Sequence, residues 1–231
     1  MRKITFILVL ALLVWLPTVY ALRIPKPIKF TNLQDPSQVT ALNETLNGLW
    51  NISNGLYQPD QYDDIRIAGL AMRTNATAPD LIAFAPATTA LLAYGFDGTG
   101  TNEQAYFAIQ IPHSYKKGTN IHPHIHWSPT DTNTGTVVWS LEYTWANKDG
   151  TFSAPTTIKS TAIQAGGVAW VHKYSEFADI DGTGKNISSM LICRLFRLGT
   201  DDTYEHDAAL LEMDFHIFMD TIGSDEELTK G

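Results

Sequence analysis

The sequence predicts an all-β protein, an antiparallel, jelly-roll-like β-sandwich of about eight strands preceded by an extended N-terminal arm. Three observations lead to this fold class. From residue 91 onward, polar and apolar residues alternate with a period close to two. The alternating segments are short and rich in β-branched and aromatic residues. Clusters of Gly, Asn and Asp, which favour turns, separate these segments.

The N-terminus has the order of features typical of a secretory signal. Arg2 and Lys3 precede an apolar run at 4–16, and the small residues Val19 and Ala21 fit a cleavage site. The run is short for a membrane span. We therefore expect residues 1–21 to be a signal peptide. The mature chain is then secreted or displayed on the cell surface, with no membrane span. An uncleaved N-terminal anchor is the alternative, and it also predicts export.

The chain after the signal is expected to have three parts. Residues 22–60 form an arm and a short helical segment, because 22–38 contain three prolines without a clear period and 39–57 resemble a weak helix. Residues 61–222 form the β-sandwich domain. Residues 223–231 form a C-terminal tail.

Strand segments follow one another along the sandwich domain. They are expected at residues 63–72, 81–86, 91–96, 105–112, 121–127, 136–146, 152–163, 168–180, 188–198 and 207–220. Successive side chains of a strand point to opposite faces. In the last segment, the core face therefore comprises Leu211, Met213, Phe215, Ile217 and Met219, and the other face comprises Glu212, Asp214, His216 and Phe218.

Charge and cysteine content narrow the class of protein. The formal net charge is −8 and no cluster of Lys and Arg stands out. Nucleic-acid binding is therefore not expected, because neutralising phosphates requires a basic face. The single cysteine, Cys193, has no intramolecular disulfide partner, and its apolar neighbours indicate a buried, inert thiol. Four sequons, at Asn43, Asn51, Asn75 and Asn186, are candidates for glycosylation, a number only weakly above chance.

Residues 121–127, IHPHIHW, contain three of the seven histidines. Their spacing places His122, His124 and His126 on one strand face, about 7 Å apart. Alternate imidazoles can converge on one ion, and Zn, Fe and Ni all accept imidazole nitrogen. A neighbouring strand or chain must supply further ligands. The candidates are Glu142 and His216, then His113, Glu212 and Asp214, and more weakly His172 and His206.

Several interpretations of this histidine row stay open. It is a solvated polar face without metal, a structural ion site, a catalytic ion site or a pH-sensing cluster. Pro123 removes one ladder donor and favours an edge or bulge position, where another chain can approach. Glu142, Glu212 and Asp214 suit solvent-facing positions better than acid–base catalysis. We therefore assign no catalytic residue, and no cofactor other than a candidate divalent metal.

Aromatic residues are numerous, with six tryptophans and nine tyrosines. Most are expected in the core. One or two on the polar face would suit stacking on sugar rings or contact with a protein partner.

An ordered series of segments resembles a known group of sequences. The series is QYDDIRIAGLAMR, APDLIAF, IQIPHSYKKGTNIHPHIHWSPT, GTVVWSLEYTWANKDGTF and DGTGKNISSMLICRLFR. It resembles an uncharacterised β-rich, jelly-roll-like domain of bacteriophage and environmental viral structural proteins, and PHSYKKGTNIHPHIHW is its most specific part. The resemblance implies a virion or surface building block rather than an enzyme, and it carries over no catalytic residue. The N-terminal signal departs from a virion subunit and favours an exported protein built from the same domain.

These observations predict a non-enzymatic, exported structural subunit of an extracellular or virion assembly, such as a filament or appendage. Its main partner would be another copy of the chain, joined when residues 22–38 add a strand to a neighbouring sheet edge. One alternative is a cupin-like metal-binding protein or metalloenzyme, which is weakened because no Glu follows His126 until Glu142. The other is a carbohydrate- or receptor-binding module, whose partner would be a surface glycan or receptor.

Overall fold

The computed structural model describes residues 40, 42–49, 61–85, 91–98, 103–197 and 199–230. The chain divides into two compact units, residues 1–58 and 59–231. In the first unit, residues 40 and 42–49 are helical, within the segment where a helix was expected. The expected signal peptide, the arm at 22–38 and the sequon at Asn51 lie outside the described residues. No helix in the described part of the chain is long and apolar enough to cross a membrane.

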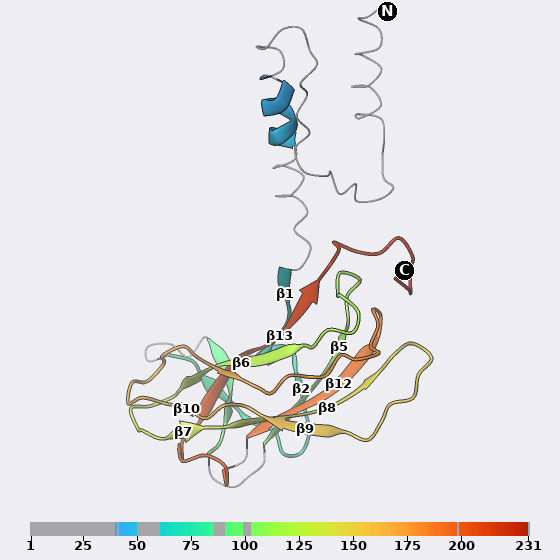
Figure 1. Ribbon diagram of the computed structural model, residues 1–231. Coiled ribbons are helices and arrows are strands. Elements are labelled where there is room, and N and C mark those ends of the chain that lie inside the picture. Colours follow the sequence, from blue (N-terminus) through green and yellow to red (C-terminus); the bar gives the residue numbers. More distant parts are fainter. Residues whose placement is uncertain are drawn as a thin grey trace, which may run out of the picture. The chain divides into compact units, whose positions relative to one another are not determined.

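The second unit is built from two antiparallel sheets (Figure 1). The sheet that carries the histidine row, called here the histidine sheet, has the strand order β11-β6-β13-β4-β3, and β1 also pairs with β13. Its strands are β1 (Gln61–Ala68), β3 (Asp80–Ala83), β4 (Leu92–Phe96), β6 (His122–Pro129), β11 (Lys173–Glu176) and β13 (Ala208–Met219).

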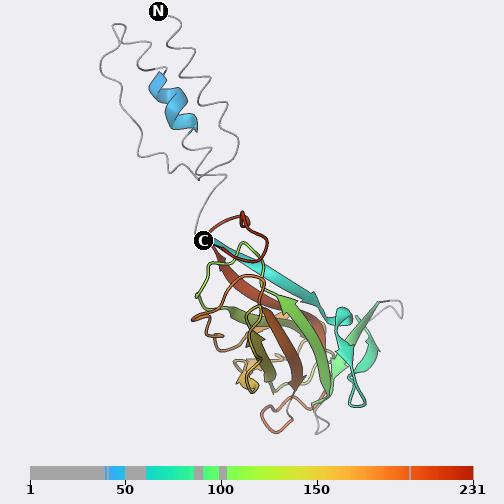
Figure 2. The same cartoon turned by 90° about the vertical axis from the view of Figure 1, so that its right-hand side faces the viewer.

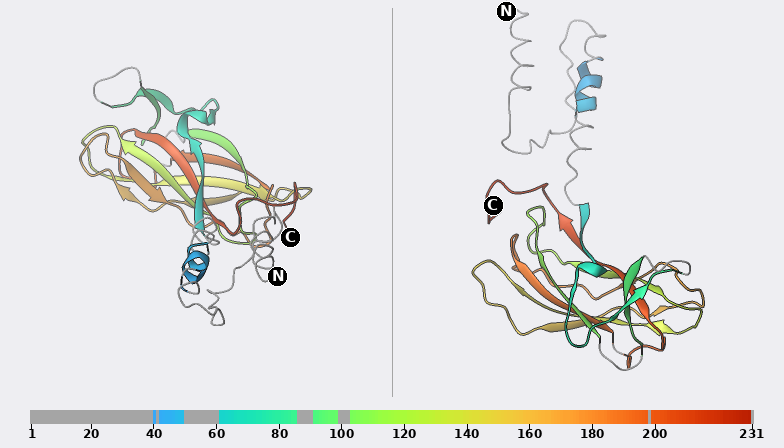
Figure 3. Two further views of the ribbon diagram at one scale, coloured as in Figure 1. Left: turned by 90° about the horizontal axis from the view of Figure 1, so that it is seen from above. Right: turned by 180° about the vertical axis from the view of Figure 1, so that it is seen from behind.

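The facing sheet has the strand order β2-β5-β12-β8-β9. Its strands are β2 (Arg73–Thr74), β5 (Gln104–Gln110), β8 (Trp139–Ala146), β9 (Thr156–Lys159) and β12 (Met190–Arg197). A separate two-stranded pair is formed by β7 (Thr136–Val137) and β10 (Ile163–Gln164), and the short 3-10 helix η1 (Gly69–Ala71) follows β1. Figure 3 shows the two sheets as stacked layers from two further directions.

The connectivity is that of a jelly roll. Within the jelly-roll strands, the chain crosses from one sheet to the other between β4 and β5, β5 and β6, β6 and β8, β9 and β11, β11 and β12, and β12 and β13. The short β2 adds two more crossings, from β1 and to β3. The set β4-β13-β6-β11 thus faces the set β5-β12-β8-β9, as in two interlocked Greek keys. The predicted all-β, antiparallel, jelly-roll-like sandwich is confirmed.

An apolar core fills the space between the sheets. Large side chains such as Trp127, Trp139, Leu195 and Phe215 are fully buried there. Each contributes roughly 1.5–3 kcal/mol through removal of its apolar surface from water. Cys193 is also buried, and burial raises the pKa of its thiol to about 12. The prediction of an inert, buried cysteine is therefore confirmed.

Strand β13 runs through the middle of the histidine sheet, and Figure 2 shows β1 lying alongside it. Met213, Phe215 and Ile217 are buried, as the alternation predicts. The core position predicted for Leu211 is wrong, because Leu210 is buried instead and a β-bulge shifts the register between residues 210 and 212. A bulge inserts one extra residue and so exchanges the two faces of the strand on one side of it.

Strand β6 lies inside its sheet, contrary to the edge position that Pro123 suggested. β13 pairs with one side of β6 and β11 with the other. The pairing with β11 ends at His124, and one residue further the Pro123 carbonyl accepts a hydrogen bond from the Phe177 N–H at 3.0 Å. Pro123, which has no backbone N–H to donate, therefore lies just beyond the end of the β6–β11 pairing. The histidine row is not a free edge for another chain.

Candidate metal-binding pocket

Strand β6 presents its histidines on the outer face of the histidine sheet. Ile125 and Trp127 alternate with them and are fully buried. The indole Nε1 of Trp127 donates a hydrogen bond of 3.0 Å to Ser175 Oγ on β11, which holds the two strands in register. Because side chains alternate, this anchoring directs His124 and His126 away from the core.

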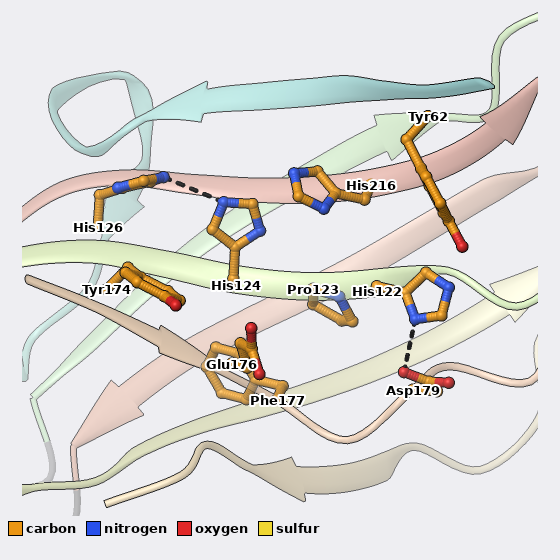
Figure 4. Close-up of a pocket in the computed structure, with 10 residues that line it drawn as sticks. All are labelled: Tyr62, His122, Pro123, His124, His126, Tyr174, Glu176, Phe177, Asp179 and His216. Atoms are coloured by element: carbon orange, nitrogen blue, oxygen red, sulfur yellow. Dashed lines mark hydrogen bonds and ion pairs between the residues drawn. The ribbon is translucent and has the colours of Figure 1, made fainter. Parts of the chain in front are cut away.

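Asp214 on β13 joins His124 and His126 in a group of three. It is the Cα partner of His124 in the pairing of β13 with β6. Its Oδ2 lies 3.3 Å from His124 Nε2 and 3.2 Å from His126 Nε2. The two Nε2 atoms are 3.0 Å apart, and Figure 4 shows the two rings directed toward each other. The side chains of His124, His126 and Asp214 are 11%, 24% and 5% exposed.

These three spacings fit a single divalent ion. Ligand atoms held about 2.1 Å from Zn²⁺ at angles of about 90–110° are about 3.0–3.4 Å from one another. The buried Oδ1 of Asp214 has no hydrogen-bond partner within the described part of the chain. Buried carboxylate oxygens are ordinarily satisfied. A cation held by Oδ2 among the three ligand atoms would supply a counter-charge for this buried carboxylate.

The protonation state of the site suits metal ligation. Burial lowers the pKa of His124 to about 4, and the neighbouring His216 and His126 lower it further in the same direction. The imidazole is therefore neutral at pH 7, with a lone pair available to a metal. Burial raises the pKa of Glu212, and the charge of Asp214 adds to this. Glu212 lies opposite His126 in the β13–β6 register, next to the three ligand atoms.

His172 contacts the ring nitrogen of His126 that points away from the three ligand atoms. Its Nε2 lies 2.7 Å from His126 Nδ1. A hydrogen bond at one ring nitrogen fixes the orientation and tautomer of an imidazole and leaves the other nitrogen for the ion. The sequence marked His172 as a weak ligand candidate, and the structure places it as the residue that orients a ligand. The contact between His172 and His126 could not be predicted from the sequence, because the two residues are far apart along the chain.

A pocket of about 570 Å³ opens beside this group (Figure 4). Two further histidines line it, each with a carboxylate partner. His122 Nδ1 is 2.7 Å from Asp179 Oδ1, and His216 Nε2 is 2.9 Å from Asp64 Oδ1. The rings of His216 and His124 have centroids 4.3 Å apart. His122 and His216, both expected as ligands, therefore line the pocket rather than complete the group of three.

Other candidates from the sequence lie away from this pocket. Glu142, expected as a further ligand, is on β8 of the facing sheet and pairs with Arg194 at 2.9 Å. This prediction is wrong because alternation along a strand does not reveal which sheet the strand joins. His113 contacts Ser224 Oγ at 2.6 Å, where the expected C-terminal tail folds back on the sandwich. His206 pairs with an aspartate 2.9 Å away in another loop.

The described sequons differ in their surroundings. Asn43 lies in the N-terminal helix, and Asn75 and Asn186 are exposed on the second unit. The Asn75 side chain accepts a hydrogen bond from the Thr77 N–H at 2.9 Å and donates one to the Tyr106 hydroxyl at 2.8 Å. Both asparagines are therefore exposed to solvent, but at Asn75 the amide nitrogen to which a glycan is attached already donates the bond to Tyr106.

Comparisons with known proteins give weak structural similarity. No protein-family model and no curated protein matches this sequence. The chain is similar to the CBM35 from Cellvibrio japonicus Abf62, with 10% identity, a TM-score of 0.41, and 66% of this chain and 92% of that chain covered. It is similar to a family 35 carbohydrate binding module from Clostridium thermocellum, with 6% identity and a TM-score of 0.36, and the match covers 66% of this chain and 97% of that chain. It is also similar to a structure of infectious bursal disease virus Gx strain, with 12% identity and a TM-score of 0.33, and the match covers 69% of this chain and 33% of that chain. TM-scores this low do not bear on ligand or activity.

Proposed function

We propose that this chain is an exported, non-enzymatic binding module that holds a divalent transition-metal ion through His124, His126 and Asp214. The ion anchors a ligand in the adjacent pocket. The observation that carries this proposal is the triangle of ligand atoms 3.0–3.3 Å apart, formed by two imidazole nitrogens and one oxygen of a buried carboxylate. Two imidazoles and one carboxylate suit Zn, Fe or Ni.

Three protein ligands leave coordination positions free for a molecule outside the protein. The neighbouring pocket shares His124 and His126 with the proposed ion site, so a ligand in it can reach these positions. The site lies on the outer face of a sheet, with His126 still 24% exposed. This exposure lets a ligand from solution approach the ion.

The other expected functions have less support. A cupin-like shell completed by Glu142 has little support, because Glu142 lies on the facing sheet. A self-assembling subunit depends on residues 22–38, which lie outside the described residues. The metal-dependent binding role therefore has the most direct support from the described residues.

Calorimetric titration of ZnCl₂ into the metal-free full chain tests the proposal. We expect one ion per chain, and loss of binding in each of the variants His124→Ala, His126→Ala and Asp214→Ala. Glu142→Ala is the matched control, and it should bind zinc as the unmodified chain does. X-ray absorption should show nitrogen and oxygen neighbours at about 2.0–2.1 Å. Zinc binding that persists in Asp214→Ala would contradict the assignment.

A further inference from the structure

The lining of the pocket narrows the class of ligand. Glu176 and Asp179 contribute carboxylates, and the described lining residues include no Lys or Arg. Asp64, the partner of His216, adds a further negative charge nearby. An anionic ligand would meet repulsion from these groups. A neutral, hydroxyl-rich ligand can instead donate hydrogen bonds to the carboxylates.

Two exposed tyrosines mark the ends of the histidine row. Tyr62 on β1 is 58% exposed and Tyr174 on β11 is 56% exposed. Figure 4 shows them on opposite sides of the pocket, with His124 and His216 between them. Exposed aromatic rings beside a pocket are binding groups, because a flat ring gives a large contact area and loses little conformational entropy on binding.

The tyrosine rings are held in place by their neighbours. The Tyr62 ring packs edge-on against Phe218, with centroids 5.0 Å apart, and against His122 at 5.6 Å. The Tyr174 ring is nearly perpendicular to that of His124, with centroids 6.5 Å apart. Rings that are ordered before binding lower the entropic cost of association. The apolar face of a sugar ring is a suitable partner for such a surface.

Size points to more than one sugar unit. The volume of about 570 Å³ lies within the range of about 300–1,000 Å³ usual for small-ligand pockets. His122 and His126 are four residues apart on one strand, which corresponds to about 13 Å. This distance exceeds one sugar ring, so one unit can reach the ion while a second lies toward Tyr62.

We propose that the ligand of this site is a neutral oligosaccharide, which binds the ion through adjacent hydroxyl groups and stacks its rings on Tyr62 and Tyr174. This inference rests on the proposed metal binding. It adds three requirements: the glycan is uncharged, its binding depends on the ion, and the two tyrosines contribute to glycan affinity without contributing to metal affinity.

The test is binding of the zinc-loaded full chain to immobilised neutral oligosaccharides from cellulose, xylan, mannan and galactan, beside polygalacturonate and sialylated glycans. We expect retention on at least one neutral glycan and none on the anionic ones. EDTA should release the protein and added zinc should restore binding. Tyr62→Ala and Tyr174→Ala should each weaken glycan affinity about three- to tenfold and leave zinc affinity unchanged. Phe152→Ala removes an aromatic that is exposed outside the pocket, and this control should change neither.

The outcomes separate the two proposals. A chain that binds one zinc but no neutral glycan overturns the oligosaccharide and leaves the metal site intact. Preference for the anionic glycans, retention in EDTA, or unchanged glycan binding in both Tyr62→Ala and Tyr174→Ala also overturns it. A chain that does not bind zinc overturns both proposals.

Discussion

Asp214 lies directly opposite His124 in the antiparallel pairing of β13 with β6, and its Oδ2 is 3.3 Å from His124 Nε2. The Asp214 side chain is almost fully buried, and its second oxygen has no hydrogen-bond partner in the described part of the chain. A buried carboxylate without a full set of partners lowers stability. We therefore expect the buried Asp214 carboxylate to lower the unfolding free energy of the metal-free protein, and a bound cation to offset this loss.

Replacing Asp214 by Asn should separate stability from metal binding. Without metal, Asp214→Asn should melt at or above the temperature of the unmodified chain, because a buried negative charge is removed with little change of shape. Zinc at about 100 times its Kd should stabilise the unmodified chain by about 2.7 kcal/mol. This corresponds to about 5–10 °C for a protein of this size. The zinc-dependent shift should be absent in Asp214→Asn. Thermal unfolding with and without zinc checks both expectations. If metal-free Asp214→Asn melts well below the unmodified chain, the buried carboxylate does not destabilise the metal-free protein.

His172 should act through His126 and not as a ligand. Its Nε2 is 2.7 Å from His126 Nδ1. Loss of such a supporting hydrogen bond typically weakens metal affinity about 10–100-fold. We expect His172→Ala to show that decrease in a zinc titration, with the stoichiometry still one ion per chain. His206→Ala, far from the site in another loop, is the control. Complete loss of binding in His172→Ala would mean that His172 coordinates the ion.

Glu103 should make stability depend on pH. Burial raises its pKa from 4.5 to about 7, and the charges of Asp97, Asp207 and Asp80 contribute. Between these two values the folded chain binds more protons at this site than the unfolded chain, so stability falls as pH rises from about 4.5 to about 7. Glu103→Gln removes this loss and should melt higher than the unmodified chain at pH 8 but equally at pH 4. Equal melting temperatures at pH 8 would refute this account.

The buried ion pair of Arg197 and Asp202 should be sensitive to loss of one partner. Both side chains are at most 1% exposed, and Arg197 Nε lies 2.6 Å from Asp202 Oδ2. Asp202→Ala leaves a buried guanidinium without a counter-charge, which costs about 3–5 kcal/mol of unfolding free energy. Asp201→Ala is the matched control, because its partner Lys159 is 54% exposed and such pairs contribute less than about 1 kcal/mol. Urea unfolding of the two variants measures the difference, and similar losses in both would contradict the expectation.

Much of the fold could be predicted from short-range pattern. Alternation identified the strands and placed Phe215 and Ile217 inside, because neighbouring side chains on any strand must face opposite ways. It failed where the backbone departs from that geometry. The bulge near Leu210 exchanges the two faces of β13, and no local signal marks it. The edge position expected from Pro123 was also wrong, because β11 pairs with β6 only as far as His124 and the proline lies just beyond that pairing.

The sequence by itself determined that His122, His124 and His126 share one face of a strand, because this depends only on the local geometry of an extended chain. Only the tertiary structure decided what lies next to them. Asp214 and His172 reach His124 and His126 from strands and loops far away in the chain, whereas Glu142 is carried to the facing sheet. Strand order and register arise from long-range hydrogen bonding and core packing, which periodicity along a single strand does not encode.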